Sequence, residues 1–151
     1  MERDDVIYQC LQTVRAFNKS LNSVISRKGV FSSEWTIMKV IHQGRERSQT
    51  ELAKELGVEA AAISKTLAKL EDKGLIEKHS LPGQRGKFIA LTEKGETLMD
   101  PIGHLVDKHR TAALAGLSEE ELYKLLESLK KIENNLVSVS YTHLTLPTNR
   151  E

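Results

Sequence analysis

The sequence predicts a mainly α-helical protein in which two helices joined by a tight turn lead into a two-stranded hairpin, with long helices before and after. Apolar residues recur at steps of three and four along most of the 151 residues, which is the period of an amphipathic helix. Two short stretches rich in β-forming residues lie between residues 75 and 91, on either side of a Pro-Gly turn. These features predict a winged helix-turn-helix lobe, with N- and C-terminal helices that form a dimerisation lobe.

Overall composition excludes several classes of protein. The chain is 39% apolar, enough for one modest core, and its formal net charge is +1, from 22 basic and 21 acidic residues. Binding to a polyanion must therefore rest on where charges lie rather than on their sum. There is no secretory h-region and no run of about 18 apolar residues, so we expect a soluble, cytoplasmic protein with no membrane partner. Because phosphate-binding loops, nucleophile elbows, paired cysteines and His-Glu-x-x-His are missing, we expect neither an enzyme nor a cofactor.

Two helices are expected before the turn motif. The first covers about residues 3–28 and ends at Gly29; its apolar stripe consists of Val6, Ile7, Cys10, Leu11, Val14, Phe17, Leu21, Val24 and Ile25. Ser32 and Ser33 are the expected caps of the second helix, and Gly44 is its expected stop. The second helix carries apolar residues at Trp35, Ile37, Met38, Val40 and Ile41.

The next two helices form the turn motif. Ser48-Gln49-Thr50-Glu51 matches a capping box, which predicts the start of a short third helix. Gly57 is the expected left-handed cap, and a fourth helix is expected from about Ala60 to Lys73, ended by Gly74. At 100° per residue, the fourth helix turns Ile63, Leu67 and Leu70 to one side and leaves small and basic residues on the other.

A basic hairpin and two further helices complete the pattern. Strands are expected at residues 75–79 and 87–91, and between Lys78 and Thr92 there are three cations and no acid. Thr92 is the expected cap of a helix with a kink or restart at Asp100-Pro101, and Ser118 opens a second capping box before the last helix. The apolar stripes of the first and last helices exceed what a small domain covers alone, so we expect them to pack across a dimer. Residues 138–151 lose the helical period and are expected to be a disordered or appended tail without function.

Three segments, "SQTELAKELGV", "AAISKTLAKLEDKGLIEK" and "RGKFIALTEKG", together with the order of the elements, resemble the MarR (multiple-antibiotic-resistance regulator) family of bacterial transcription factors. The resemblance runs from about Val6 to Val137 and implies one domain over residues 1–137, with its winged helix at about 32–92 and its dimerisation helices at about 3–28 and 93–137. It implies a homodimeric repressor whose first, fifth and sixth helices intertwine. The fourth helix would enter the major groove of a pseudo-palindromic operator, the wing would reach the minor groove, and a small aromatic or phenolic effector would release the DNA.

The resemblance and the residue pattern indicate the same contact set. The groove-facing residues are expected to be Ala61, Ala62, Ser64, Lys65, Thr66 and Lys69, with Thr66 nearest the apolar arc. Ser48, Gln49 and Thr50 are expected to hold phosphates, and Lys78, Arg85 and Lys87 to contact DNA from the wing. Two positions depart from the family pattern: Gly83 replaces the usual wing aspartate, and Glu59 replaces the usual Ser, Thr or Asp cap of the fourth helix.

Several of these residues have a plainer alternative. The cationic face can be an ordinary solvated helix face, and a winged helix can bind protein instead of DNA. Trp35 either lines the effector crevice or is simply core. Cys10 either senses oxidants or packs on the apolar stripe, where no neighbouring cation activates it. His104 and Asp107 stand one turn apart but are too few for a metal site, so none is expected.

Overall fold

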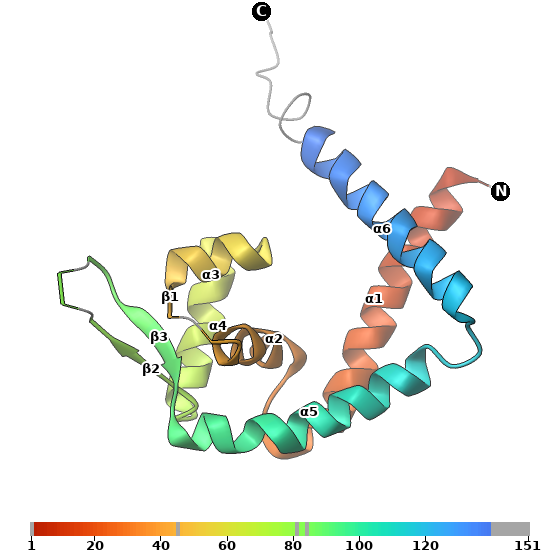
Figure 1. Ribbon diagram of the computed structural model, residues 1–151. Coiled ribbons are helices and arrows are strands. Elements are labelled where there is room, and N and C mark those ends of the chain that lie inside the picture. The colour runs from red at the N-terminus through yellow and green to blue at the C-terminus, as the bar shows by residue number, and fades with distance from the viewer. Residues whose placement is uncertain (1, 45, 81, 84, 140–151) are drawn as a thin grey trace, which may run out of the picture. The chain divides into compact units, whose positions relative to one another are not determined.

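The computed structural model describes residues 2–44, 46–80, 82–83 and 85–139 (Figure 1). Contacts within the chain divide it into two units, residues 1–113 and 114–151. The first unit opens with α1 (Arg3–Ile25), which runs into a short 3-10 turn, η1 (Ser26–Lys28). Gly29 ends this segment with φ of +85°, as its position in the sequence predicts. The next helix is α2 (Ser32–His42).

The start of α2 corrects the predicted caps. Ser32 and Ser33 lie inside the first turn, and Phe31 is the residue that precedes the helix. The Phe31 amide donates to Glu34 Oε1 at 2.9 Å, and the Ser32 amide donates to Asn22 Oδ1 of α1 at 2.6 Å. The helix begins earlier than predicted because acceptors from Glu34 and from another helix satisfy its free amides.

Glu34 is itself buried, with 1% of its surface exposed. Lys73 Nζ, at the end of α4 (Ala60–Asp72), donates to both Glu34 carboxylate oxygens at 2.7 and 2.8 Å. A buried carboxylate is tolerated when it is paired and hydrogen-bonded, as Glu34 is. This ion pair ties the first turn of α2 to Lys73, the residue that caps the C-terminus of α4.

Three short antiparallel strands form the sheet of the lobe: β1 (Arg47–Ser48), β2 (Ile76–His79) and β3 (Phe88–Leu91), in the order β1-β3-β2. The register pairs Arg47 with Ile89 and Ile76 with Leu91. The hairpin of β2 and β3 confirms the predicted wing. The sequence analysis missed β1, because two residues are too short to show the alternation that marks a strand.

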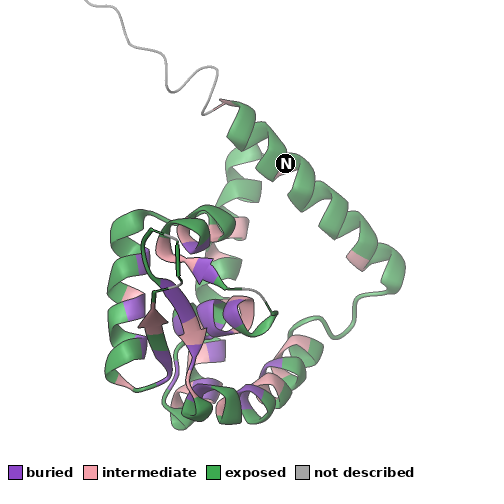
Figure 2. Cartoon of the chain, turned by 60° about the vertical axis from the view of Figure 1, so that its left-hand side comes forward, coloured by how far each residue is buried: buried purple, intermediate pink, exposed green. Residues whose placement is uncertain are grey.

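The helices α3 (Gln49–Leu56), α4 and α5 (Glu93–Ala113) pack with α1, α2 and the sheet around one core. Gly57 and Gly74 have φ of +64° and +71°, which confirms the predicted ends of α3 and α4. Figure 2 shows the buried residues concentrated in this lobe. The core consists of Leu21, Ile25, Val30, Trp35, Ile37, Met38, Ile41, Leu52, Ile63, Leu67, Leu70, Leu75, Ile76, Ile89, Leu91, Met99, Ile102 and Val106.

Of the two alternatives predicted at Asp100-Pro101, a kink or a restart, the restart is wrong, because α5 passes through Pro101 as one continuous helix (Figure 1). A proline inside a helix removes one backbone hydrogen bond and costs about 3 kcal/mol. Met99, Ile102 and Val106 are all at most 6% exposed, so α5 buries apolar side chains on both sides of the proline. We attribute the continuity of α5 to this burial, which offsets the local cost.

Two glycines of α5 provide a matched test of packing. A Cβ at Gly95 would overlap the backbone oxygen of Leu75, whereas a Cβ at Gly103 would meet only the Trp35 ring, at 3.8 Å. We expect Gly95→Ala to lower the free energy of unfolding by at least about 2 kcal/mol, because backbone must move. Gly103→Ala should raise it by up to about 1 kcal/mol, because alanine favours the helix. Urea denaturation of both variants measures the difference, and equal effects would contradict the close approach at Gly95.

The second unit contains α6 (Glu119–Val139), whose start confirms the predicted capping box. The Glu121 amide donates to Ser118 Oγ at 3.2 Å, and the Ser118 amide donates to Glu121 Oε2 at 2.7 Å. The latter bond lowers the pKa of Glu121 below its usual value. The helix includes Ser138 and Val139, two residues past the predicted boundary; the remainder of the predicted tail, residues 140–151, lies outside the described residues.

No described side chain of α6 is buried, although its stripe is strongly apolar. Exposed residues of this stripe are Leu125, Leu126, Leu129, Leu136 and Val137. The N-terminal half of α1 likewise exposes Val6, Ile7, Leu11 and Val14. In the described part of the chain, no helix combines the length and apolar character that spanning a membrane requires.

Candidate nucleic-acid interface

The helix-turn-helix is built by α3 and α4 and the short turn between them. Ser48 Oγ accepts the Glu51 amide at 3.2 Å, which shows the serine half of the predicted capping box. The Gly57 turn closes when the Val58 amide donates to the Ala53 oxygen at 3.1 Å. Because Leu52 of α3 is fully buried in the core that also holds the apolar side of α4, the turn and the core together fix α4 relative to α3.

The side of α4 away from the core is exposed and free of acids in its first half. The exposed residues are Ala61, Ala62, Ser64, Lys65, Ala68 and Lys69. Lys65 and Lys69 form no ion pair with any other described residue, so both charges remain available. Glu59, which precedes α4, makes no side-chain capping bond, in agreement with its weak capping tendency.

Thr66 and Ala62 lie at one edge of this face. Thr66 is half-buried, and its hydroxyl donates to the Ala62 backbone oxygen at 3.1 Å. Both residues also line a cavity beside α4. Two of the predicted groove-facing residues therefore sit between the exposed face and the cavity, as the position of Thr66 near the apolar arc suggests.

The predicted phosphate-binding residues lie at the N-terminus of α3. Ser48 and Gln49 are half-buried and Thr50 is exposed. Ser48 serves as the helix cap, and free amides of the first turn remain at this end of the helix. Capping and phosphate binding are compatible here, because a cap occupies only part of the donors.

The three cations of the wing differ in exposure. Arg85 and Lys87 are exposed on the segment that joins β2 to β3. Lys78 on β2 is half-buried, and its Nζ lies 3.8 Å from Glu71 Oε1 of α4. The sequence analysis missed this partner because Glu71 belongs to another element. Lys78 is thus partly neutralised at the base of the wing, and Arg85 and Lys87 carry its outward charge.

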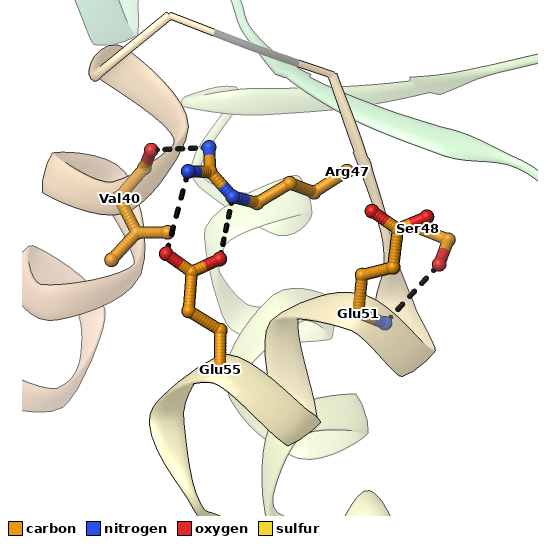
Figure 3. A network of polar contacts seen from close by, with 5 residues as sticks. All are labelled: Val40, Arg47, Ser48, Glu51 and Glu55. Carbon is orange, nitrogen blue, oxygen red and sulfur yellow. Dashed lines mark hydrogen bonds and ion pairs between the residues drawn. The ribbon is translucent and has the colours of Figure 1, made fainter.

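A second cluster, which the sequence analysis missed, joins β1 to α2 and α3 (Figure 3). Arg47 of β1 is only 7% exposed, although it is an arginine. Its Nε donates to Glu55 Oε2 of α3 at 2.6 Å, and its Nη1 donates to the Val40 backbone oxygen of α2 at 2.7 Å. No motif signals this cluster, because the three residues come from three different elements.

A cavity of about 380 Å³ opens between α1, α2, the α3–α4 turn, α4 and α5. It is lined mainly by Phe17, Asn18, Leu21, Ser32, Ser33, Trp35, Thr36, Ile37, Leu56, Val58, Ala62, Ile63, Thr66 and Arg110. Trp35 is 4% exposed and belongs to the core, yet it also lines this cavity. Trp35 is therefore a core residue that also borders a cavity, and its role in binding an effector stays a prediction. Its indole Nε1 is buried without a hydrogen-bond partner among the described residues.

Cys10 and His104 are the remaining candidates of the sequence analysis. Cys10 is half-buried on α1 as a free thiol. His109, on another side of α5 from His104, packs edge-on against Phe17 and lies 2.9 Å from Ser20 Oγ. Within the described ranges, no three His, Cys, Asp or Glu side chains come close enough together to hold a metal ion.

Comparison with known proteins finds similarity in both sequence and fold. Residues 29–85 match the family model described as MarR family. The fold is similar to a MarR/EmrR family transcriptional regulator from Acinetobacter sp. ADP1, with 26% identity over 91% of this chain and 99% of that chain, at a TM-score of 0.82. It is also similar to a mutant MarR from E. coli in complex with operator DNA, with 22% identity over 85% and 93% of the two chains, at a TM-score of 0.79.

A third solved structure, Staphylococcus aureus MarR in complex with salicylate and kanamycin, is 20% identical over 89% of this chain and 92% of that chain, at a TM-score of 0.76. The sequence match to the family model covers the helix-turn-helix and part of the wing. The structural matches cover 93% and 99% of the E. coli and Acinetobacter chains. The chain therefore matches the MarR family model over residues 29–85, and its fold is similar to that of known MarR-type transcription regulators.

Proposed function

We propose that this protein is a homodimeric, sequence-specific DNA-binding repressor that reads a pseudo-palindromic operator in the cytoplasm. The observation that carries the proposal is the exposed face of α4, on which Lys65 and Lys69 stand among alanines and serine without an acidic partner in the described chain. Small side chains let a helix approach base edges closely, and lysines neutralise phosphates. The similarity to a regulator solved with operator DNA supports the same role.

Three further parts of the lobe complete the proposed contact surface. Ser48, Gln49 and Thr50 would meet phosphates through side chains and the free amides of α3. Arg85 and Lys87 would reach the adjacent minor groove from the wing. Lys78 would contribute less, because Glu71 lies beside it.

The apolar stripes of α1 and α6 support a homodimer. Isolated apolar residues on a surface are common, but stripes that extend along whole helices usually mark an interface. A dimer would also supply the two-fold symmetry that a pseudo-palindromic operator requires. Each copy would then insert its α4 into one half-site.

The direct test is selection of DNA from a random pool by the purified protein. We expect an enriched sequence with two inverted half-sites whose centres lie about one helical turn, roughly 10 base pairs, apart. We also expect affinity to fall steeply with salt. Failure to enrich any sequence, together with weak salt dependence, would favour the alternative of a winged helix that binds protein.

We propose that a small aromatic acid releases the DNA by binding the cavity beside α4. The cavity combines apolar walls, including Phe17 and Leu21, with the Arg110 side chain. Because the walls come from both α4 and α1, a ligand there would favour one spacing of α4 in the dimer over another. The salicylate complex of the S. aureus protein supports this class of effector.

Trp35 makes the effector proposal measurable, because it is the single tryptophan of the chain. Salicylate should change its fluorescence in a saturable way. Arg110→Met should weaken this binding about tenfold, because it removes the charge that would pair with the carboxylate. Arg85→Met, on the wing, is the matched control and should leave salicylate affinity unchanged. Equal affinity of salicylate for all three proteins would exclude Arg110 as the anchor.

A further inference from the structure

We infer that Arg47, which is buried, is a positioning residue that sets α4 and the wing at the spacing needed for simultaneous DNA contact. This inference rests on the proposed DNA-binding function. It concerns a cluster of residues from β1, α2 and α3 that we call the Arg47 clamp: Arg47, Val40 and Glu55 (Figure 3).

The clamp joins three elements through one guanidinium. Arg47 lies on β1, where its backbone pairs with Ile89 of β3 and so with the wing. Its Nε and Nη2 donate to the two Glu55 oxygens of α3 at 2.6 and 3.4 Å, and its Nη1 donates to the Val40 oxygen of α2 at 2.7 Å. The wing, α2 and α3 are therefore held at one point.

The chemistry of the clamp requires an arginine. The Val40 carbonyl lies in the last turn of α2, where backbone oxygens lack partners within the helix and carry the negative end of its dipole. A guanidinium can donate to this oxygen and, with its other edge, to a carboxylate in a fixed planar arrangement. A lysine has one charged nitrogen and cannot hold both acceptors in that geometry.

Burial distinguishes the clamp from a surface ion pair. The Arg47 side chain is 9% exposed, whereas that of Glu55 is 40% exposed. A largely buried guanidinium that loses its partners leaves unsatisfied donors, so the clamp resists local rearrangement. The low exposure of Arg47 also argues against direct binding of Arg47 to DNA.

The clamp acts on the proposed DNA surface through the elements next to it. Ser48, the residue after Arg47, caps α3, and α3 packs against α4 through the buried Leu52. On its other side, the β1–β3 pairing leads to the strand that follows Arg85 and Lys87. Loosening the clamp should therefore let the wing and α4 move independently. A smaller fraction of the protein's conformations would then place the wing and α4 on DNA at the same time.

Two variants test the inference. Arg47→Lys keeps the positive charge but removes the planar guanidinium that donates to both acceptors. Glu55→Gln removes the negative charge of the half-exposed partner and keeps its size. Ile25→Val, which removes a buried methylene group from α1, is the control for reduced stability alone. All measurements use the full chain at a temperature where each variant is folded.

The first readout is amide hydrogen exchange without DNA. In Arg47→Lys, and to a smaller extent in Glu55→Gln, the amides of α3 and of the β1–β3 pairing should exchange faster while those in the middle of α5 do not change. Ile25→Val should show no such local pattern. Unchanged exchange in both clamp variants would overturn the inference.

The second readout is the affinity for the selected operator, measured in a double-mutant cycle that combines each variant with Arg85→Ala. Arg47→Lys should weaken binding between about threefold and thirtyfold. Arg85→Ala should cost less in the Arg47→Lys background than in the wild type, because a wing that is already misplaced contributes less to binding. Reduced stability alone would leave the two effects additive, as we expect for Ile25→Val with Arg85→Ala.

The outcomes separate this inference from the proposed function. If the wild type binds an operator and the clamp variants bind equally well, or their effects add to that of Arg85→Ala, the positioning role is wrong and the DNA-binding function stands. If the wild type binds no DNA, the proposed function is wrong, and Arg47 then has no role in DNA binding. Faster local exchange with a coupled decrease in affinity supports both.

Discussion

Replacing Leu129 with glutamate should convert the protein to a monomer and weaken operator binding by roughly 100- to 10,000-fold, the range expected when two linked binding events become independent. Leu129 lies on the apolar stripe of α6 and is 46% exposed. A carboxylate at this position would have to be buried without a partner in the proposed dimer. Sedimentation velocity measures the oligomeric state, and fluorescence anisotropy of labelled operator measures the affinity.

The matched control for this prediction is Asn134→Glu. It adds the same charge to α6, about 140° around the helix from Leu129 at 100° per residue. We expect this variant to remain dimeric and to bind DNA normally. If Leu129→Glu stayed dimeric with unchanged affinity, the α6 stripe would not be the interface.

Replacing Lys65 and Lys69 together with alanine should weaken operator binding by roughly 100- to 1,000-fold at about 0.1 M salt, because a protein that neutralises fewer phosphates releases fewer counterions. The slope of log affinity against log salt should become shallower by about one unit for each phosphate that is no longer neutralised. Since alanine is a good helix former, α4 itself should persist. Anisotropy titrations at several salt concentrations measure both quantities.

The control for the lysine prediction is the pair Lys124→Ala and Lys130→Ala. This double variant removes the same net charge from α6, outside the winged helix. It should change affinity and salt slope little if the α4 lysines act by direct binding rather than through overall charge. Equal decreases in affinity in both double variants would show that α4 is not the helix that binds DNA.

Several features were readable from the sequence because they depend on residues near one another in the chain. The ends of α3 and α4 follow from Gly57 and Gly74, which adopt the left-handed conformation that glycine permits. The starts of α3 and α6 follow from hydroxyls three residues before the amides they accept. A helical period of 3.6 residues then suffices to separate the buried and exposed sides of α4.

Other features depended on residues far apart in sequence. The first turn of α2 takes a cap from Glu34, and Lys73, 39 positions later, holds that carboxylate. The continuity of α5 through Pro101 follows from burial of its apolar side chains in the core. Local helix propensity does not predict this burial.

The sequence by itself therefore determined which segments become helices and hairpin and which side of α4 is cationic, since local hydrogen bonds and side-chain period decide both. Tertiary structure alone decided that Arg47 meets Glu55 and Val40, that Glu71 shields Lys78, and that Trp35 and Arg110 share a cavity. The physical reason is that these interactions join separate elements whose side chains have no fixed spacing in the chain and meet only when the core brings the elements together.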